Sequence, residues 1–451
     1  MMKAQLLPLL VLISSQALAQ EGVLDLTNLA NYAAQPVPNY IQKDNTPENN
    51  PITNQGATLG RVLFYDVRLS KNSTVSCASC HQQGRAFGDP DLASTGVAGM
   101  TGRHSMRLIN SRFAREDNFF WDERAPSLEA QTTQPIQDHV EMGFSGADGD
   151  PSFADLITRL STIEEYQVMF RSVYGDETVT EGRVQQVLSQ FIRSIQSFDS
   201  KYDTGRAQVG NNNAPFPNYT ASENRGKLLF MTPPPQGGAG CNACHQAPEF
   251  DIDPNSRNNG VIGAIGGGTD TTNTRSPSLR DMADANGVLH GGLMHNAVFT
   301  SLRQAIDHYD AIPRPAAPNL DPRLGNGRGA QNLNLTEQEK EDLELFLLTL
   351  TGVSVYTDPK WSDPFDGNGN LSLIILPTET ATFTIGEDKM VTVSTKGVPN
   401  FTYLCVTSSD LVNWSDPIEI IADADGMVSM TAPASAKSQF YRIGYAVATE
   451  E

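Results

Sequence analysis

The chain has little positive charge, and beyond its first 20 residues it has no long hydrophobic run. Its 451 residues include 32 Lys and Arg against 52 Asp and Glu, which gives a formal net charge of −20 at pH 7. Phosphate backbones repel so acidic a chain, so we expect no nucleic-acid partner. A helix needs roughly 18 or more apolar residues to cross a bilayer, and no such run follows residue 20. We therefore expect a protein that does not span a membrane.

The N-terminus is the one long apolar segment. Residues 1–19, MMKAQLLPLLVLISSQALA, place Lys3 before an apolar stretch and end on Ala17-Leu18-Ala19. This order is typical of a secretory signal peptide, cleaved here between Ala19 and Gln20. A retained anchor helix is the alternative, although the apolar core is short for one. The expected location is the periplasm, or an exported position at the cell surface.

Cysteine is also scarce, with five residues in the chain. Four of them lie in two Cys-x-x-Cys-His units, formed by Cys77, Cys80 and His81 and by Cys241, Cys244 and His245. This pattern is typical of c-type haem attachment, because two thiols on one turn can add to both haem vinyl groups while the adjacent imidazole binds the iron. Disulfides, zinc sites and thioredoxin-like sites also use paired cysteines, but none of these explains both histidines. The sequence therefore predicts two covalently bound haem c groups, and it leaves Cys405 as a buried, unreactive thiol.

Repeated sequence around the two motifs indicates an internal duplication. Gly60-Arg61-Val62-Leu63-Phe64 precedes the first motif, and Gly226-Lys227-Leu228-Leu229-Phe230 precedes the second. We therefore predict a mainly α fold with two tandem cytochrome c-like domains. Period-two alternation begins later, at 391–395, 401–406 and 440–443, and predicts a small C-terminal antiparallel β-sandwich. The expected order is a signal peptide at 1–19, an extended lead at 20–50, an N-terminal haem domain at 51–215, a C-terminal haem domain at 216–355, a linker at 356–370 and the sandwich at 371–451.

The residues around the first motif resemble those of a known family. The segments 59–64, 76–81, 120–125 and 140–143, together with the spacing of Trp121, Gln131 and Glu141, resemble the bacterial dihaem cytochrome c peroxidases. That family includes the MauG-type enzymes, which oxidise tryptophan residues of partner proteins. The resemblance covers residues 50–352 and does not reach the predicted sandwich.

The resemblance implies roles for individual residues around the first haem. Peroxide cleavage needs an open iron position, a group that moves a proton and a polar partner that holds the peroxide. The resemblance implies that the first haem is the peroxidatic one, with His81 as its proximal ligand and Gln131 and Glu141 on its distal side. It also implies that Trp121 relays electrons between the haems. Without the resemblance, these residues would be interpreted as a surface Gln, a surface Glu and a core Trp.

The second haem, on His245, resembles the family's electron-entry haem. Its sixth ligand affects its reduction potential, because Met raises the potential and a hard oxygen ligand lowers it. Tyr309, in the segment 302–310, occupies the ligand position, which resembles the MauG-type subgroup. Met294 and His308 are the competing candidates.

Two departures from the family concern the first haem and calcium. Some family members carry a loop His that caps the peroxidatic iron, and Thr95-Gly96-Val97-Ala98 has none at that place. The iron is therefore expected to be open unless His104 caps it. His104 also replaces an Asn of the family's interhaem calcium site, which argues against bound calcium.

Three functions remain as hypotheses. The first is a periplasmic peroxidase that reduces hydrogen peroxide with electrons from a small c-type cytochrome or a cupredoxin. The second is MauG-type, peroxide-dependent oxidation of a protein substrate, which Tyr309 and the missing loop His favour. The third is a non-enzymatic electron carrier or redox sensor. The pair Gln131 and Glu141 argues against the third, because a carrier needs no distal acid–base pair.

Overall fold

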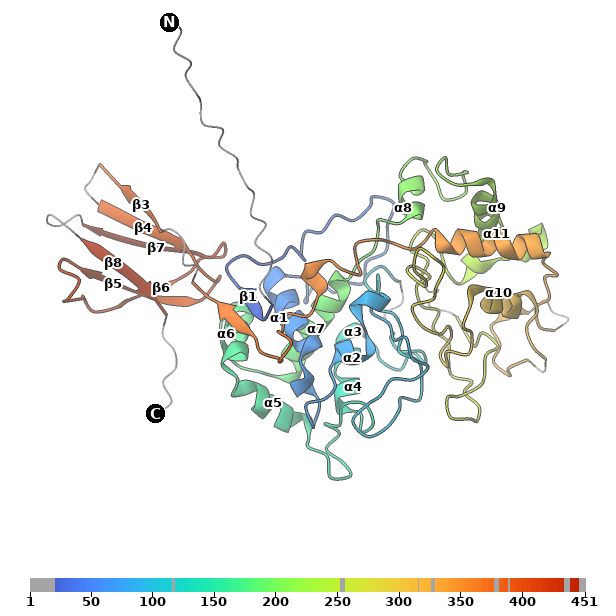
Figure 1. Ribbon diagram of the computed structural model, residues 1–451, viewed down its shortest axis with the longest axis horizontal. Coiled ribbons are helices and arrows are strands. Elements are labelled where there is room, and N and C mark those ends of the chain that lie inside the picture. Colours follow the sequence, from blue (N-terminus) through green and yellow to red (C-terminus); the bar gives the residue numbers. More distant parts are fainter. Residues whose placement is uncertain are drawn as a thin grey trace, which may run out of the picture.

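A computed structural model of the chain describes residues 21–115, 118–251, 256–314, 316–325, 329–376, 381–387, 390–433 and 439–445. The signal peptide expected at 1–19 lies outside these residues. Figure 1 shows two helical regions beside each other and a group of β-strands at one end. Helices account for 28% of the structure, so long loops form much of the regions predicted to be mainly α. No helix in the described part of the chain has the length and apolarity to cross a membrane.

The first helical region contains the first Cys-x-x-Cys-His unit. Its helices are α1 (Asn54–Tyr65), α2 (Cys77–Cys80), α3 (Leu128–Thr132), α4 (Gln134–Gln137), α5 (Phe153–Ser161), α6 (Glu164–Tyr174) and α7 (Glu181–Ser194), with short 3-10 turns η1 (Val67–Leu69) and η2 (Gln83–Arg85). Helices α1 and α7 pack against each other around buried Leu63, Phe64 and Phe191. Gly60 permits this packing, because a Cβ there would lie 1.9 Å from the carbonyl oxygen of Val187.

The second helical region contains the second unit. It consists of α8 (Lys201–Arg206), α9 (Ala221–Met231), α10 (Leu302–Asp310) and α11 (Glu337–Leu348), with 3-10 turns η3 (Pro234–Gln236), η4 (Cys241–Ala243) and η5 (Pro322–Leu324). Helices α9 and α11 pack at Gly226, where a Cβ would lie 1.8 Å from the carbonyl oxygen of Asp342. The repeated glycine of the two sequence copies, Gly60 and Gly226, therefore has the same packing role in both regions. Helix α11 begins with a capping box of Thr336 and Glu339.

Helix α8 packs with the second region, although it falls within the range 51–215 expected for the first domain. The ring of Tyr202 lies 4.7 Å from that of Phe250, centroid to centroid, and its backbone N–H donates to Thr349 O at 2.9 Å. Aromatic contacts with residues after 215 thus draw this helix across the expected boundary.

The C-terminal strands form two three-stranded antiparallel sheets. One has the order β3 (Thr382–Ile385), β4 (Met390–Lys396), β7 (Met427–Pro433), and the other β6 (Ile418–Ile421), β5 (Thr402–Ser408), β8 (Phe440–Gly444). Alternate side chains of the long strands are buried, including Val393, Tyr403, Cys405 and Val428, as period-two alternation requires. The burial of Cys405 agrees with the expectation of an enclosed thiol.

A further strand pair links the lead to the end of the linker. Strand β1 (Val23–Asp25) pairs in parallel with β2 (Ser372–Ile374), although β2 lies in the range expected for the sandwich. The linker range itself is packed through the 3-10 turn η6 (Pro359–Trp361). Trp361 is 2% exposed, and its Nε1 donates to Ser194 Oγ on α7 at 3.3 Å. The segment 356–370 is therefore part of the packed structure around α1 and α7.

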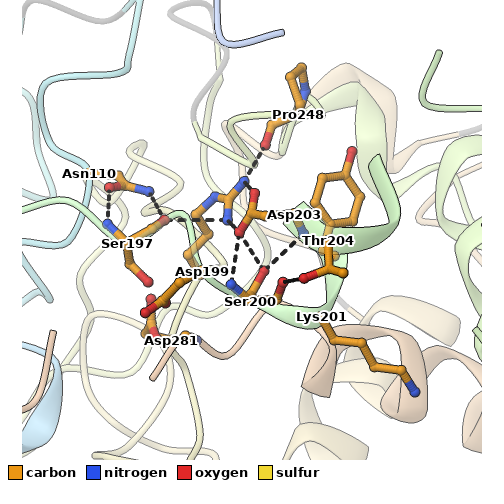
Figure 2. A network of polar contacts seen from close by, with 12 residues as sticks. Asn110, Ser197, Asp199, Ser200, Lys201, Asp203, Thr204, Pro248 and Asp281 are labelled. Carbon is orange, nitrogen blue, oxygen red and sulfur yellow. Dashed lines mark hydrogen bonds and ion pairs between the residues drawn. The ribbon is translucent and has the colours of Figure 1, made fainter. Parts of the chain in front are cut away.

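A buried ion pair lies in the second helical region, where that region meets the first. The guanidinium of Arg280, which is fully buried, donates to both carboxylate oxygens of Asp203, at 2.9 and 3.0 Å, and to Pro248 O at 2.9 Å. Figure 2 shows this network, in which Asn110 of the first region exchanges two hydrogen bonds with the backbone of Ser197. Arg280 Nη1 also donates to Ser197 O at 3.4 Å, so the ion pair is connected through Ser197 to Asn110 of the first region. Removing one partner of such a buried pair costs about 3–5 kcal/mol.

Candidate active site

The first Cys-x-x-Cys-His unit forms a single turn, helix α2, with His81 at its C-terminal end. The backbone N–H of His81 donates to Cys77 O at 2.9 Å, which closes the turn. The imidazole Nδ1 donates to Phe87 O at 3.1 Å, so the proton sits on Nδ1 and the other ring nitrogen can bind a metal. Burial lowers the pKa of His81, which favours the neutral, ligating form.

The thiols of this unit are half-buried beside His81. Burial, together with the neighbouring Cys80, raises the pKa of Cys77 to about 12, and burial raises that of Cys80 to about 11. No disulfide joins any of the chain's five cysteines, all of which are described. Cys77, Cys80 and His81 line one cavity together, an arrangement that fits a haem c.

Gln131 and Glu141 line the same cavity as His81, and they come from other elements of the first region. Gln131 is on α3, whose first turn is capped by Ser127 Oγ accepting from Ala130 N. Glu141 follows α4, and Asp138 Oδ1 fixes this turn by accepting from the N–H groups of Val140 and Glu141. The structure thus brings together three of the predicted site residues, because His81, Gln131 and Glu141 also share a second cavity of about 450 Å³.

The carboxyl of Glu141 has a perturbed acidity. Burial, and to a lesser degree the nearby charge of Asp138, raises its pKa to about 7, against a smaller opposing effect of Arg124. A carboxyl with this pKa can both accept and release a proton near neutral pH. The side-chain environment therefore suits Glu141 to acid–base chemistry.

The loop at Thr95–Ala98 lies directly against Glu141. The N–H of Val97 donates to Glu141 O at 2.9 Å, and a Cβ on Gly96 would lie 2.1 Å from Val140 O. The loop thus contacts the Glu141 turn through its backbone, and its sequence supplies no imidazole there. His104, the other candidate cap, has its Nδ1 bonded to Asp91 O at 3.0 Å.

The second unit has a different set of neighbours. Cys241 and Cys244 are in and directly after the turn η4, and they line a cavity with His245 and Tyr309. Burial lowers the pKa of His245 to about 4, and it raises that of Cys241 to about 12. These residues also fit a haem c, with a neutral imidazole and two thiols.

Two of the three candidate sixth ligands line a second cavity beside His245. Tyr309, Met294 and His245 line this second cavity together. Asn259 Nδ2 lies 3.3 Å from Tyr309 Oη and 3.2 Å from Met294 Sδ. The ring of His308 instead donates through Nε2 to Asn259 O at 2.9 Å. The geometry therefore leaves Tyr309 and Met294 as competitors and commits His308 to a backbone contact. Asn259, which the sequence analysis did not single out, carries no motif that would have marked it.

Trp121 lies between the two units. Its side chain lines both the His81 cavity and the His245 cavity, and its Nε1 donates to His104 O at 2.8 Å. Its backbone O accepts from the N–H groups of Thr274 and Arg275, at 2.8 and 3.1 Å. These contacts from both helical regions hold Trp121 between the two cavities.

The calcium site of the family is the remaining metal site to consider. Within the described part of the chain, no group of three or more His, Cys, Asp or Glu side chains is placed to hold a metal ion.

Comparison with known proteins agrees with the family suggested by the sequence. The profile of the family described as di-haem cytochrome c peroxidase matches residues 54–210. The methylamine utilization protein MauG of Methylorubrum extorquens is 31% identical over 67% of this chain and 80% of its own length. Cytochrome c551 peroxidase of Nitrosomonas europaea is 27% identical over 72% of this chain and 85% of its own length.

A solved structure agrees as well. The crystal structure of a MauG-like protein associated with microbial copper homeostasis is similar with a TM-score of 0.59 and 29% identity, over 73% of this chain and 98% of that one. The resemblance inferred from the sequence is therefore confirmed. The chain belongs to the dihaem cytochrome c peroxidase family that includes MauG, and it is a haem-dependent, peroxide-using oxidoreductase.

Proposed function

We propose that this chain is a periplasmic dihaem peroxidase that reduces hydrogen peroxide at the His81 cavity. In this proposal the two helical regions, expected at 51–215 and 216–355, are tandem cytochrome c-like domains with α8 packed on the second. Each Cys-x-x-Cys-His unit binds one haem c covalently. The observation that carries the proposal is the shared cavity of His81, Gln131 and Glu141. A carboxyl and an amide opposite a ligating imidazole are the groups that cleavage of a peroxide O–O bond requires.

Each residue of this cavity has a distinct task. A bound haem would supply the electrons and the Lewis-acidic iron for O–O cleavage. Glu141 accepts the proton of the incoming peroxide and returns it to the departing oxygen, which its pKa of about 7 permits in both directions. The side-chain amide of Gln131 holds the peroxide by hydrogen bonding, and His81 is held in one orientation by Phe87 O.

The His245 cavity and Trp121 complete the electron path in this proposal. Electrons from a small c-type cytochrome or a cupredoxin would enter at the second region. Trp121 lines both cavities, so its indole bridges the distance between them through a single side chain.

Peroxide-dependent oxidation of a protein substrate, as in MauG-type enzymes, is the second candidate. Two observations favour it: Tyr309 lines the His245 cavity, and the loop at Thr95–Ala98 contributes no His beside Glu141. In this case electrons would leave the substrate through Trp121 rather than arrive from a donor.

Steady-state turnover separates these proposals. With hydrogen peroxide and a reduced small c-type cytochrome, the wild-type protein should oxidise the cytochrome, and Glu141→Gln should lower the rate about 10²- to 10⁴-fold. Glu164→Gln makes the same chemical change at an exposed position of α6, and it should leave the rate unchanged. Peroxide consumption without cytochrome oxidation would favour the MauG-type alternative, and equal rates for wild type and Glu141→Gln would refute the acid–base assignment.

A further inference from the structure

Arg107 occupies the meeting point of the two cavities. It lines the cavity that contains His245 and Tyr309 and also the cavity that contains His81 and Glu141. Its side chain passes over Gly88, where a Cβ would lie 2.8 Å from Arg107 Cγ. The guanidinium is thus placed where groups bound in either cavity can reach it.

The positive charge of Arg107 has no carboxylate partner in the described part of the chain. Nη2 donates to Ser278 O at 3.1 Å. Among the described residues, the buried Nε has no hydrogen-bond partner and Arg107 takes part in no ion pair. The Asp281 carboxyl interacts with it only at longer range, and that carboxyl is engaged by Gly352 N and Tyr356 Oη. Burial also raises the pKa of Asp281, which weakens it further as a counter-charge.

A half-buried arginine without a counter-charge is stabilised by an anion. Transfer of an unpaired charge from water into the protein interior is costly, and the cost falls only when an opposite charge and hydrogen bonds are supplied. In accord with this, burial lowers the pKa of Arg107 to about 10. By contrast Arg280, which is more deeply buried, has Asp203 as a bidentate partner.

Internal symmetry explains why one arginine could serve two sites. Ser105-Met106-Arg107-Leu108 and Ser276-Pro277-Ser278-Leu279 follow the two motifs, 24 residues after His81 and 31 residues after His245, and residues of each segment line both cavities. The hydrogen bond from Arg107 to Ser278 O joins the corresponding positions of the two copies. One copy has an arginine at this position and the other has a serine. Of this pair of positions, only Arg107 therefore brings a positive charge to the two cavities.

We propose that Arg107 is a shared anchor for haem carboxylates, whose guanidinium binds a propionate of the haem on each side. The inference rests on the proposed function, since it requires two bound haems. A haem carries carboxylate groups, and guanidinium–carboxylate pairs are the strongest of the common charge-assisted hydrogen bonds. A fixed cation also favours the reduced haem, which carries one positive charge fewer, so Arg107 raises the reduction potentials of both haems.

Spectroelectrochemical titration of the holoprotein tests this. Arg107→Met should lower the midpoint potentials of both haems, each by about a tenfold change in the reduction equilibrium constant, or about 59 mV for one electron. Arg107→Lys should recover more than half of the shift because it keeps the charge. Arg112→Met removes an arginine that pairs with Asp44 and lines neither cavity, so it should leave both potentials unchanged.

The pH dependence of the potentials provides a second readout. Loss of the cation raises the pKa of a paired propionate, so the potentials of Arg107→Met should become pH-dependent at a higher pH than those of the wild type. A purely structural arginine would alter thermal stability without moving either quantity. If Arg107→Met does not fold, Arg107→Gln and Arg107→Lys give the same comparison of charge lost against charge kept.

The outcomes distinguish this inference from the proposed function. Two bound haems with unchanged potentials in Arg107→Met would overturn the anchor and leave the proposed function intact. A shift confined to one haem would contradict the shared role. Fewer than two haems in the wild-type protein would overturn the proposed function first, and this inference with it.

Discussion

The two Cys-x-x-Cys-His units carry the same ligating residues in unlike surroundings. The His81 cavity is about 450 Å³ and presents the side chains of Gln131 and Glu141. The cavity shared by His245, Tyr309 and Met294 is about 140 Å³ and is lined largely by apolar side chains. Another cavity beside His245 and Tyr309, which Cys241 and Cys244 also line, is about 330 Å³. The carboxyl of Glu141 and the amide of Gln131 suit the first cavity to a small polar substrate, whereas the largely apolar cavity of Tyr309 and Met294 suits electron transfer. The comparison teaches that the attachment motif fixes which group is bound, and the surrounding side chains decide what that group does.

The largest expected effect comes from removing one attachment site at a time. Cys77→Ser with Cys80→Ser should leave one covalent haem and abolish peroxide reduction. Cys241→Ser with Cys244→Ser should also leave one covalent haem, but the remaining His81 site should still react with peroxide while turnover with cytochrome stops. Haem content by alkaline pyridine spectra and peroxide reaction by stopped flow check both variants. If the two double variants behaved alike, the proposed functional difference between the two units would be wrong.

The next effect concerns the pH dependence of peroxide turnover. Because Glu141 has a pKa of about 7, its carboxylate, which accepts the peroxide proton, is depleted below that pH. We expect kcat/KM for peroxide to fall about tenfold per pH unit below pH 7 and to level off above it. The Glu141→Gln protein should not show this fall of kcat/KM below pH 7. If both proteins show the same pH profile, another group causes the fall.

Trp121→Phe should slow electron transfer between the two units by about tenfold, which corresponds to about 1.4 kcal/mol in the barrier. The indole lines both cavities, and the smaller ring is harder to oxidise and cannot donate to His104 O. Pre-steady-state reoxidation of the two reduced haems measures this rate. Trp361→Phe is the matched control, because Trp361 is buried against α7 and lines neither cavity. An equal slowing in the control would mean that the effect is one of stability.

The smallest expected effect is spectroscopic. Tyr309→Phe should change the absorption and paramagnetic resonance spectra of the His245 haem, because an oxygen ligand is lost. Met294→Leu should leave these spectra unaltered. The reverse result would transfer the ligand role to Met294, which shares Asn259 with Tyr309.

Local sequence was sufficient for those parts of the structure that local contacts determine. The Cys-x-x-Cys-His turns, the capping box of α11 and the period-two alternation of β4 and β5 all follow from residues close in the chain. The shared cavity of Gln131, Glu141 and His81 could be expected only through the family resemblance, because these side chains come from three separate elements.

Contacts between distant segments could not be predicted in the same way. The pairing of β1 with β2 and the packing of α8 against Phe250 depend on surfaces that exist only in the folded chain. The sequence around Arg107 did not indicate a role for this residue. That role is inferred from the folded chain, in which no carboxylate among the described residues pairs with it. Nor could spacing choose between Tyr309 and Met294, because both reach the same cavity and the same Asn259.

The central claim is that the His81 cavity, with Glu141 above it, is where peroxide reacts. The most direct measurement is the second-order rate constant of hydrogen peroxide with the fully oxidised holoprotein, without prior reduction, for wild type and Glu141→Gln. The account predicts a rapid spectral change in the wild-type protein, linear in peroxide concentration, and a rate at least about 10²-fold lower in the variant. An inert wild-type protein, or a variant that reacts as fast as the wild type, would contradict it.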